Sequence, residues 1–173
     1  MGGVMSKKII ILSGKQFSGK DTFAKFLLEF LPDYTRIGIA DAIKLEYGKQ
    51  KGLTIEEIEK DKPLYRADLI NLGNWGRAQD PDYWLNKIID FDGNVIVPDI
   101  RLPHELELFR SHGALALRVE ANRDNRALRG NLVKEDDPTE MSLDKISDWD
   151  YVIENSGTLE ELRQKAKELA EKL

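Results

Sequence analysis

The chain has 173 residues, of which 41% are hydrophobic and 33% are charged, and it contains no cysteine. This length and composition predict one folded domain over residues 1–173. The lack of cysteine excludes a disulfide scaffold, a thiolate metal site and a cysteine nucleophile. No apolar run has the ~18 residues of a membrane span, so we expect a cytoplasmic protein with no membrane partner.

The charge is unevenly distributed along the chain. Residues 135–173 hold 12 acidic and 5 basic side chains, whereas residues 1–134 hold 19 acidic and 21 basic ones. The net charge of -5 is therefore a property of the last part of the chain. Nonspecific nucleic-acid binding draws on a concentrated basic face, so we expect no nucleic-acid partner. A small anionic ligand needs only a few local cations and is still allowed.

Strand and helix patterns alternate in the first half of the sequence. A β-branched apolar run before Gly14 is typical of a buried parallel strand. After a glycine loop, apolar residues recur at helical spacing as far as Pro32. Thr54 and Glu57 have the pattern of a capping box. We expect strands over residues 7–13 and 35–40, and helices over residues 20–31, 42–48, 55–60 and 66–72.

The same alternation continues to the C-terminus. Asp80 and Pro81 have the pattern of an N-cap and the first residue of a helix, and Thr158 with Glu161 has that of a second capping box. The alternation predicts an α/β fold, a mostly parallel sheet with helices on both faces. We expect strands over 94–98, 114–119 and 151–154, a helix over 103–113, a long connection over 122–144, and a last helix that turns Leu159, Leu162, Ala166, Leu169 and Leu173 inward.

A glycine loop lies between the first predicted strand and the first predicted helix. Residues 14–20 read G-K-Q-F-S-G-K, which is the pattern G-x-x-x-x-G-K. Glycines let successive backbone N–H groups curl around a phosphate, the helix N-terminus adds a positive dipole end, and Lys20 reaches the β- and γ-phosphates. Spacing and position therefore both predict a phosphate-binding loop.

Asp21 departs from this pattern, because it stands where a Ser or Thr hydroxyl would hold Mg²⁺, and Thr22 follows one residue later. A carboxylate holds Mg²⁺ directly or through water, but without the metal it repels phosphate. The alternative is that Asp21 only complements the dipole of the helix.

Further candidate residues follow later strands. Asp99 comes at the carboxyl edge of a predicted strand, where open α/β sheets bind ligands, and is either a second acidic group on Mg²⁺ or a loop cap. Arg101 would lie beside it and hold a phosphoryl oxygen. Arg123, Arg126 and Arg129 recur at helical spacing in the long connection. They form either a lid over transferring phosphates or a solvated basic face, and the connection itself is either a lid or a disordered segment.

The histidines and tryptophans carry less information. His104 and His112 have no partner pattern that would make a catalytic triad, so we expect surface or capping roles. Trp75, Trp84 and Trp149 are expected in the core or in a pocket wall.

Four segments occur in the same order in a family of P-loop kinases. They are GKQFSGKDT at residues 14–22, LGNWGRAQDPDYW at 72–84, VIVPDIRLPHE at 95–105 and DWDYVIENSGTLEEL at 148–162. The chain resembles the deoxynucleoside monophosphate kinases of bacteriophages and bacteria, and it is also similar to the animal-type phosphomevalonate kinases. The G-K-D variant of the loop is a signature of this family. The resemblance implies a nucleoside monophosphate kinase fold: three α/β/α layers, a five-stranded parallel sheet and a lid over about residues 122–144.

The resemblance also implies cofactors and site residues. ATP and Mg²⁺ would be the cofactors, with Asp21 and Asp99 close to the metal. Catalytic roles would fall to Lys20, Asp21, Asp99, Arg101, Arg123 and Arg126, and the acceptor's phosphate would be bound by Lys44, Arg66, Arg77 and Arg101. The ATP-binding residues would be Gly14, Lys15, Gln16, Phe17, Ser18, Gly19, Lys20, Asp21, Thr22, Arg129, Asn155 and Gly157.

The leading hypothesis is an ATP-dependent kinase that phosphorylates the phosphate of a small phosphomonoester, with a deoxynucleoside monophosphate as the favoured acceptor. Such an acceptor is already anionic, so positioning and electrostatics replace a strong base. Phosphomevalonate kinase is the alternative within the class, because D-D-P-T-E at 136–140 is closer to that pattern. A nucleotide-binding regulator without acceptor chemistry is the alternative outside it. We expect a small phosphorylated substrate as partner, and a monomer or a homodimer.

Overall fold

The computed structural model describes residues 7–173, which divide into two compact units. Unit 1 joins the chain up to Arg36 with Asp92–Leu173, and unit 2 is Ile37–Phe91. No helix of the described residues is both long enough and apolar enough to cross a bilayer.

Unit 1 is built on a five-stranded parallel sheet in the order β2-β3-β1-β4-β5. The central strand β1 is a run of three isoleucines and a leucine before Ser13, and all its residues are buried, as expected of a strand covered on both faces. The predicted α/β sheet is thus confirmed. The strands are β1 (Ile9–Ser13), β2 (Tyr34–Arg36), β3 (Asn94–Val97), β4 (Leu115–Glu120) and β5 (Tyr151–Glu154).

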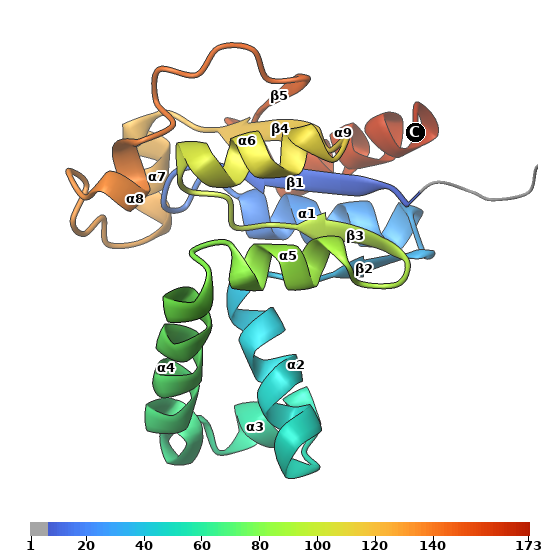
Figure 1. The fold of residues 1–173 in the computed structure, drawn as a ribbon. Coiled ribbons are helices and arrows are strands. Elements are labelled where there is room, and N and C mark those ends of the chain that lie inside the picture. Colours follow the sequence, from blue (N-terminus) through green and yellow to red (C-terminus); the bar gives the residue numbers. More distant parts are fainter. Residues whose placement is uncertain (1–6) are drawn as a thin grey trace, which may run out of the picture. The chain divides into compact units, whose positions relative to one another are not determined.

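Helices cover both faces of this sheet. Figure 1 shows α6 (Pro103–Ser111) on one face, and α1 (Lys20–Phe30) with α9 (Leu159–Glu171) on the other. Between α1, α9 and the sheet lies a core cluster that includes Phe23, Leu117 and Leu162. This packing fixes the start of α1, and therefore the glycine loop, at the carboxyl edge of the sheet.

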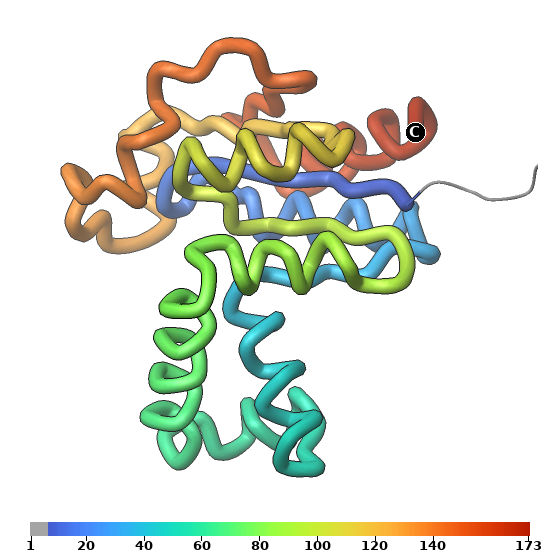
Figure 2. Tube along the Cα trace, in the orientation of Figure 1, coloured from blue at the N-terminus to red at the C-terminus, as the bar shows by residue number. Residues whose placement is uncertain are grey.

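The long connection after β4 contains two short helices, α7 (Arg123–Arg129) and α8 (Pro138–Met141). Each begins at a side-chain cap, because Asn122 accepts from the N–H of Asn125 and Asp137 accepts from that of Thr139. Figure 2 traces the chain from α8 to β5 as an irregular excursion. The connection is thus a structured segment, and we call residues 122–144 the lid segment.

Unit 2 consists of helices α2 (Ile39–Lys51), α3 (Ile55–Lys60), α4 (Lys62–Gln79) and α5 (Tyr83–Ile89). Trp84 on α5 is its largest buried side chain, and the indole N–H donates to the carbonyl of Gly73 at 3.0 Å. The predicted capping box is confirmed, since Thr54 and Glu57 bond each other's N–H.

Two predicted boundaries in and near unit 2 are wrong. The strand expected over residues 35–40 ends at Arg36, because Gly38 caps α2 and its N–H donates to Asp41 at 2.8 Å. Asp80 does not begin a helix. Its N–H closes the last turn of α4, and α5 begins three residues later at Tyr83.

Three predictions of burial are also wrong. Trp75 on α4 is 50% exposed, and its ring meets that of Tyr83 edge-on. Leu159 is 68% exposed at the first position of α9, and Leu173, which follows the end of that helix, is 37% exposed.

The second predicted capping box forms only in part within residues 7–173. The Thr158 side chain accepts from the N–H of Glu161, but the Glu161 side chain does not accept from the N–H of Thr158.

Candidate active site

The glycine loop turns sharply between β1 and α1. The N–H of Ser18 donates to the carbonyl of Lys15 at 3.0 Å, and Phe17 has a left-handed φ of 58°. Gly19 has a φ of 97°, and a Cβ there would lie 2.2 Å from Asn155 Nδ2. Only glycine fits this position without displacing its neighbour. The N–H groups at the start of α1 have no intrahelical acceptor and form the anion-binding end of the helix.

Side chains from outside the loop bind its carbonyl groups. Asn155 Nδ2 donates to the carbonyl of Ser18 at 2.8 Å. Arg129 donates to the carbonyls of Phe17 and Asn155, at 2.9 and 2.8 Å. Arg126, which is 6% exposed, reaches the carbonyl of Gln16 at 3.4 Å. In the structure Asn155 and Arg129 thus brace the loop, and the nucleotide contacts that the family resemblance implies for them stay a prediction.

The charged residues of the loop are paired. Lys20 is 9% exposed, and its Nζ lies 3.5 Å from Asp21 Oδ2. Asp21 also lies 3.8 Å from the guanidinium of Arg36. Lys15 Nζ lies 2.9 Å from Asp144 of the lid segment. Thr22 is partly buried in the first turn of α1, and Gly157 is exposed just before the cap of α9.

Asp99 and Arg101 follow β3, which pairs with β1 in register, so both lie at the same sheet edge as the loop. The side chain of Arg101 is exposed, and its N–H donates to Glu105 at 2.9 Å. Within residues 7–173 no three acidic or histidine side chains gather as a metal site. The side chain of Asp21 is 65% exposed, and Asp21 and Asp99 both carry carboxylate oxygens, the donor type that magnesium prefers.

The three arginines of α7 have different surroundings. Arg123 is exposed and pairs with Glu135 through two bonds of 3.0 Å. The hydrogen bond of this pair raises the pKa of Arg123 and lowers the pKa of Glu135. Arg126 is buried, whereas Arg129 is exposed like Arg123, and both Arg126 and Arg129 bond backbone carbonyls. The lid role of the three arginines stays a prediction.

The predicted acceptor residues of unit 2 divide into two groups. Lys44 and Arg77 line a cavity of about 220 Å³, together with Asn74, which accepts from Arg77 at 3.4 Å, and with Ala40, Ile43, Leu69, Ile70 and Gly73. Lys44 also pairs with Glu59, and this hydrogen bond lowers the pKa of the glutamate. Arg66 lies on an exposed face of α4 and does not line the cavity.

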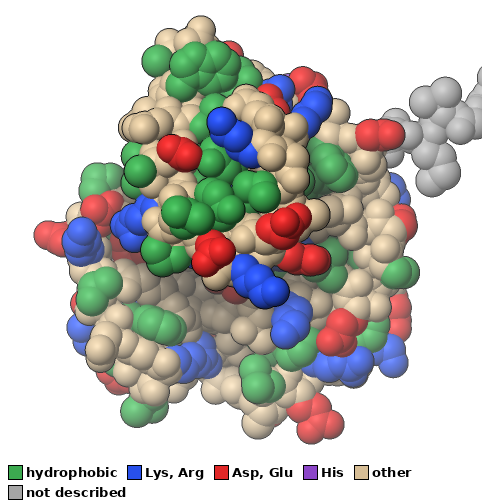
Figure 3. Space-filling view, turned by 90° about the horizontal axis from the view of Figure 1, so that it is seen from below, with side chains coloured by type: hydrophobic (Ala, Val, Ile, Leu, Met, Phe, Trp, Pro, Cys, Tyr) green, Lys and Arg blue, Asp and Glu red, His purple; other side chains and the backbone are tan. Residues whose placement is uncertain are grey.

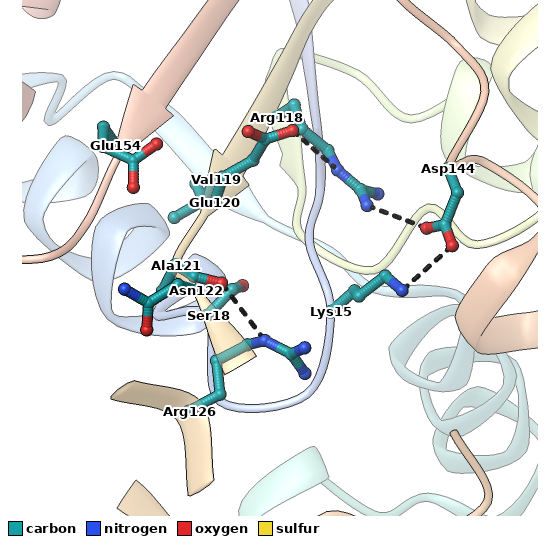
Figure 4. Close-up of a pocket in the computed structure, with 10 residues that line it drawn as sticks. All are labelled: Lys15, Ser18, Arg118, Val119, Glu120, Ala121, Asn122, Arg126, Asp144 and Glu154. Carbon is teal, nitrogen blue, oxygen red and sulfur yellow. Dashed lines mark hydrogen bonds and ion pairs between the residues drawn. The ribbon is translucent and has the colours of Figure 1, made fainter. Parts of the chain in front are cut away.

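A larger cavity of about 460 Å³ lies beside the glycine loop (Figure 4). Lys15 and the buried Arg118 both point at Asp144 there, and Arg118 donates to Ser13 Oγ at 2.7 Å. Burial lowers the pKa of Arg118. Ser18 Oγ is buried at the cavity wall and has no hydrogen-bond partner in the described part of the chain.

The sequence reasoning missed Arg118, Asp144 and Glu140, which contact the loop or its flanks. One signal for Arg118 was available: it interrupts the apolar strand of Leu115 and Val119 at a position that a sheet covered on both faces must bury. The two acids carried no such signal, because they lie in a segment without hydrophobic period.

Comparisons with solved structures show the same fold in other kinases. The shikimate kinase from Aquifex aeolicus is 18% identical, with a TM-score of 0.54 over 95% of this chain and 96% of that one. A gluconokinase from Sinorhizobium meliloti 1021 is 15% identical, with a TM-score of 0.56 over 96% and 92%. The shikimate kinase from Acinetobacter baumannii, solved with shikimate, is 19% identical, with a TM-score of 0.51 over 96% and 90%.

Two sequence families match the chain directly. The model of the family described as phosphomevalonate kinase matches residues 12–114, and that of the deoxynucleotide monophosphate kinase family matches residues 67–166. Because each match covers more than half of the 173 residues, the chain belongs to the P-loop kinases of these two families, and it is a phosphotransferase.

Proposed function

We propose that the chain transfers the γ-phosphoryl group of ATP to a deoxynucleoside monophosphate, which yields a deoxynucleoside diphosphate and ADP. The cavity of unit 2 carries this proposal. Its walls are mostly aliphatic, as a nucleobase requires, and its polar groups are the Asn74 amide and the cations Lys44 and Arg77. The amide suits a base edge, and the cations suit a phosphate.

The proposed catalysis is positioning and charge stabilisation. Lys20 would hold the β- and γ-phosphates, and Arg101 would hold the transferring group as its charge spreads. Arg123 and Arg126 would act from the lid segment by excluding water and adding positive charge. Asp21 and Asp99 would hold a magnesium ion, which when bound would neutralise charge on the phosphate oxygens. No group needs to act as a strong base, because the acceptor phosphate is already an anion.

Phosphomevalonate is the second candidate acceptor, favoured by the family match over residues 12–114. It carries a carboxylate and a hydroxyl in place of a base. Its two anionic ends would use both Lys44 and Arg77, leaving the aliphatic wall of Ile43, Leu69 and Ile70 without a matching flat group. The cavity therefore supports the nucleotide more strongly.

We propose no nucleic-acid partner. The face seen in Figure 3 intersperses Lys and Arg side chains with Asp and Glu side chains and has no continuous basic stripe.

The test is an ADP-release panel of all deoxynucleoside monophosphates, the ribonucleotides and phosphomevalonate. We expect turnover of at least one deoxynucleotide and none of phosphomevalonate, and we expect Lys20→Met to lose at least about 100-fold in rate while remaining folded. Turnover of phosphomevalonate with inert deoxynucleotides would reverse the choice of acceptor. A folded Lys20→Met variant with near-normal rate would refute the loop assignment.

A further inference from the structure

A buried carboxylate of the lid segment holds one of the glycine loop's own N–H groups. Glu140 lies on α8, is 8% exposed, and accepts from the N–H of Gln16 at 2.7 Å. A bond to an ionised acceptor is roughly twice as strong as a bond between neutral groups. Neither the sequence patterns nor the family resemblance assigned Glu140 a role.

The other polar groups of Gln16 are bonded to the lid segment as well. The N–H of Val133 donates to Gln16 Oε1 at 3.0 Å, and Gln16 Nε2 donates back to the carbonyl of Val133. Arg126 donates to the carbonyl of Gln16. All four polar groups of this residue are therefore satisfied by residues between 126 and 140. Gln16 is thus one of the loop residues that the lid segment binds, together with Lys15 and Phe17.

The Glu140 carboxylate has two conceivable roles: it positions the loop, or it occupies the place of a phosphate. A carboxylate in the phosphate position would face Lys20, but Lys20 pairs with Asp21, and within residues 7–173 it forms no ion pair with Glu140. The charge of Glu140 instead acts on Arg118, which is bonded to Ser13 before the loop. In the described residues the Glu140 side chain thus acts on Gln16 and Arg118, and it forms no ion pair with Lys20.

We propose that Glu140 is a positioning residue that fixes Gln16, so that the following N–H groups of the loop are held in the curvature that phosphates require. Its side chain would not touch the nucleotide. This role concerns the nucleotide alone and holds for either acceptor, so it can be tested without acceptor turnover.

The test compares the affinity for ADP, measured by calorimetry, in the wild type and in four variants. Glu140→Ala removes the acceptor, and we expect the dissociation constant to rise about tenfold. Glu140→Gln keeps an oxygen that accepts from Gln16, and we expect a change within about threefold. Asp136→Ala changes an exposed acid of the same segment that makes no hydrogen bond or ion pair in the described residues, and we expect wild-type affinity.

Glu140→Asp keeps the charge beside Arg118 but shortens the side chain by one methylene. It covers the case in which Glu140→Ala does not fold, and it should weaken ADP binding as the alanine variant would. Thermal unfolding verifies that each variant is folded.

Three results would overturn the proposal. If Glu140→Ala or Glu140→Asp is folded and binds ADP with wild-type affinity, Glu140 does not position the loop. Tighter binding in either variant would mean that the carboxylate competes with a phosphate. Equal weakening in Glu140→Ala and Glu140→Gln would mean that charge, and not the hydrogen bond to Gln16, is what matters.

Discussion

Asn155 shows how one side chain determines the shape of the nucleotide loop. It is 8% exposed, donates to the carbonyl of Ser18, and leaves room for no side chain at Gly19. The backbone carbonyl of Asn155 accepts from Arg129, which also donates to the backbone carbonyl of Phe17. The left-handed φ of Phe17, a conformation that costs of order 1–3 kcal/mol, persists because its surroundings hold it.

We therefore predict that Asn155→Ala lowers the free energy of unfolding by about 1–3 kcal/mol and weakens ADP binding. The physical reason is that the carbonyl of Ser18 loses its buried donor. Urea unfolding and calorimetry measure the two effects. Ser156→Ala is the control, because Ser156 is exposed and, within residues 7–173, its hydroxyl donates to Glu154 alone. Wild-type stability and affinity in Asn155→Ala would show that the loop keeps its shape without this bond.

At the scale of elements, the sequence was informative wherever a pattern is local. The β-branched run before Gly14 predicted β1, the loop spacing predicted the turn into α1, and Tyr151–Glu154 was predicted with its observed bounds. Contacts between distant segments left no local pattern. Glu140 meets Gln16 across 124 positions, and Asn155 meets Ser18 across 137, so only the folded chain reveals them.

The lid segment also depends on two ionised acids. A hydrogen bond from Arg123 lowers the pKa of Glu135, and bonds from Thr139 lower the pKa of Asp137 at the cap of α8. Both pKa values lie below those of the unfolded chain, so the folded chain binds fewer protons in acid. The two acids contribute their full stabilisation above the pKa values of the unfolded chain, which are about 4. This stabilisation is lost as the pH falls through the lowered pKa values of the folded chain.

We predict that Glu135→Gln is less stable than wild type near pH 6, and that the difference disappears as the pH falls through the lowered pKa of Glu135. Urea unfolding across this range measures it. In an Arg123→Gln background the substitution should have little effect at any pH, because the partner is gone. A difference that persists in strong acid would show that the pair does not cause it.

At the scale of the whole molecule, the described chain divides into two compact units, and the expectation of one domain over residues 1–173 stays a prediction. Unit 1 carries the loop and the sheet edge, and unit 2 carries the cavity with Lys44 and Arg77. The core of unit 2 depends on the approach of α4 to Trp84. A Cβ at Gly76 would lie 2.6 Å from the indole nitrogen, whereas one at Gly73 would meet the ends of two flexible side chains at 3.1 and 3.3 Å.

This difference predicts a selective loss of acceptor binding. Gly76→Ala should overpack unit 2 by about 1–3 kcal/mol and weaken acceptor binding, while ADP binding in unit 1 stays within about twofold of wild type. Gly73→Ala, the matched substitution one turn earlier, should destabilise less. Calorimetric titrations with ADP and with the acceptor separate the two effects. If Gly76→Ala loses affinity for ADP and for the acceptor equally, the two ligands do not bind independently.

The bonds that shape the glycine loop have a consequence for synthesis of the chain on the ribosome. The G-x-x-x-x-G-K sequence ends at Lys20, but the side chains that bind its carbonyls and its Gln16 N–H come more than 100 residues later, at positions 126, 129, 140 and 155. The central strand β1 likewise cannot pair until its two neighbours, β3 and β4, have been synthesised. A nascent chain therefore holds the complete motif long before the loop has its bracing side chains, and we expect ATP to assist folding only once the chain has been made as far as residue 155.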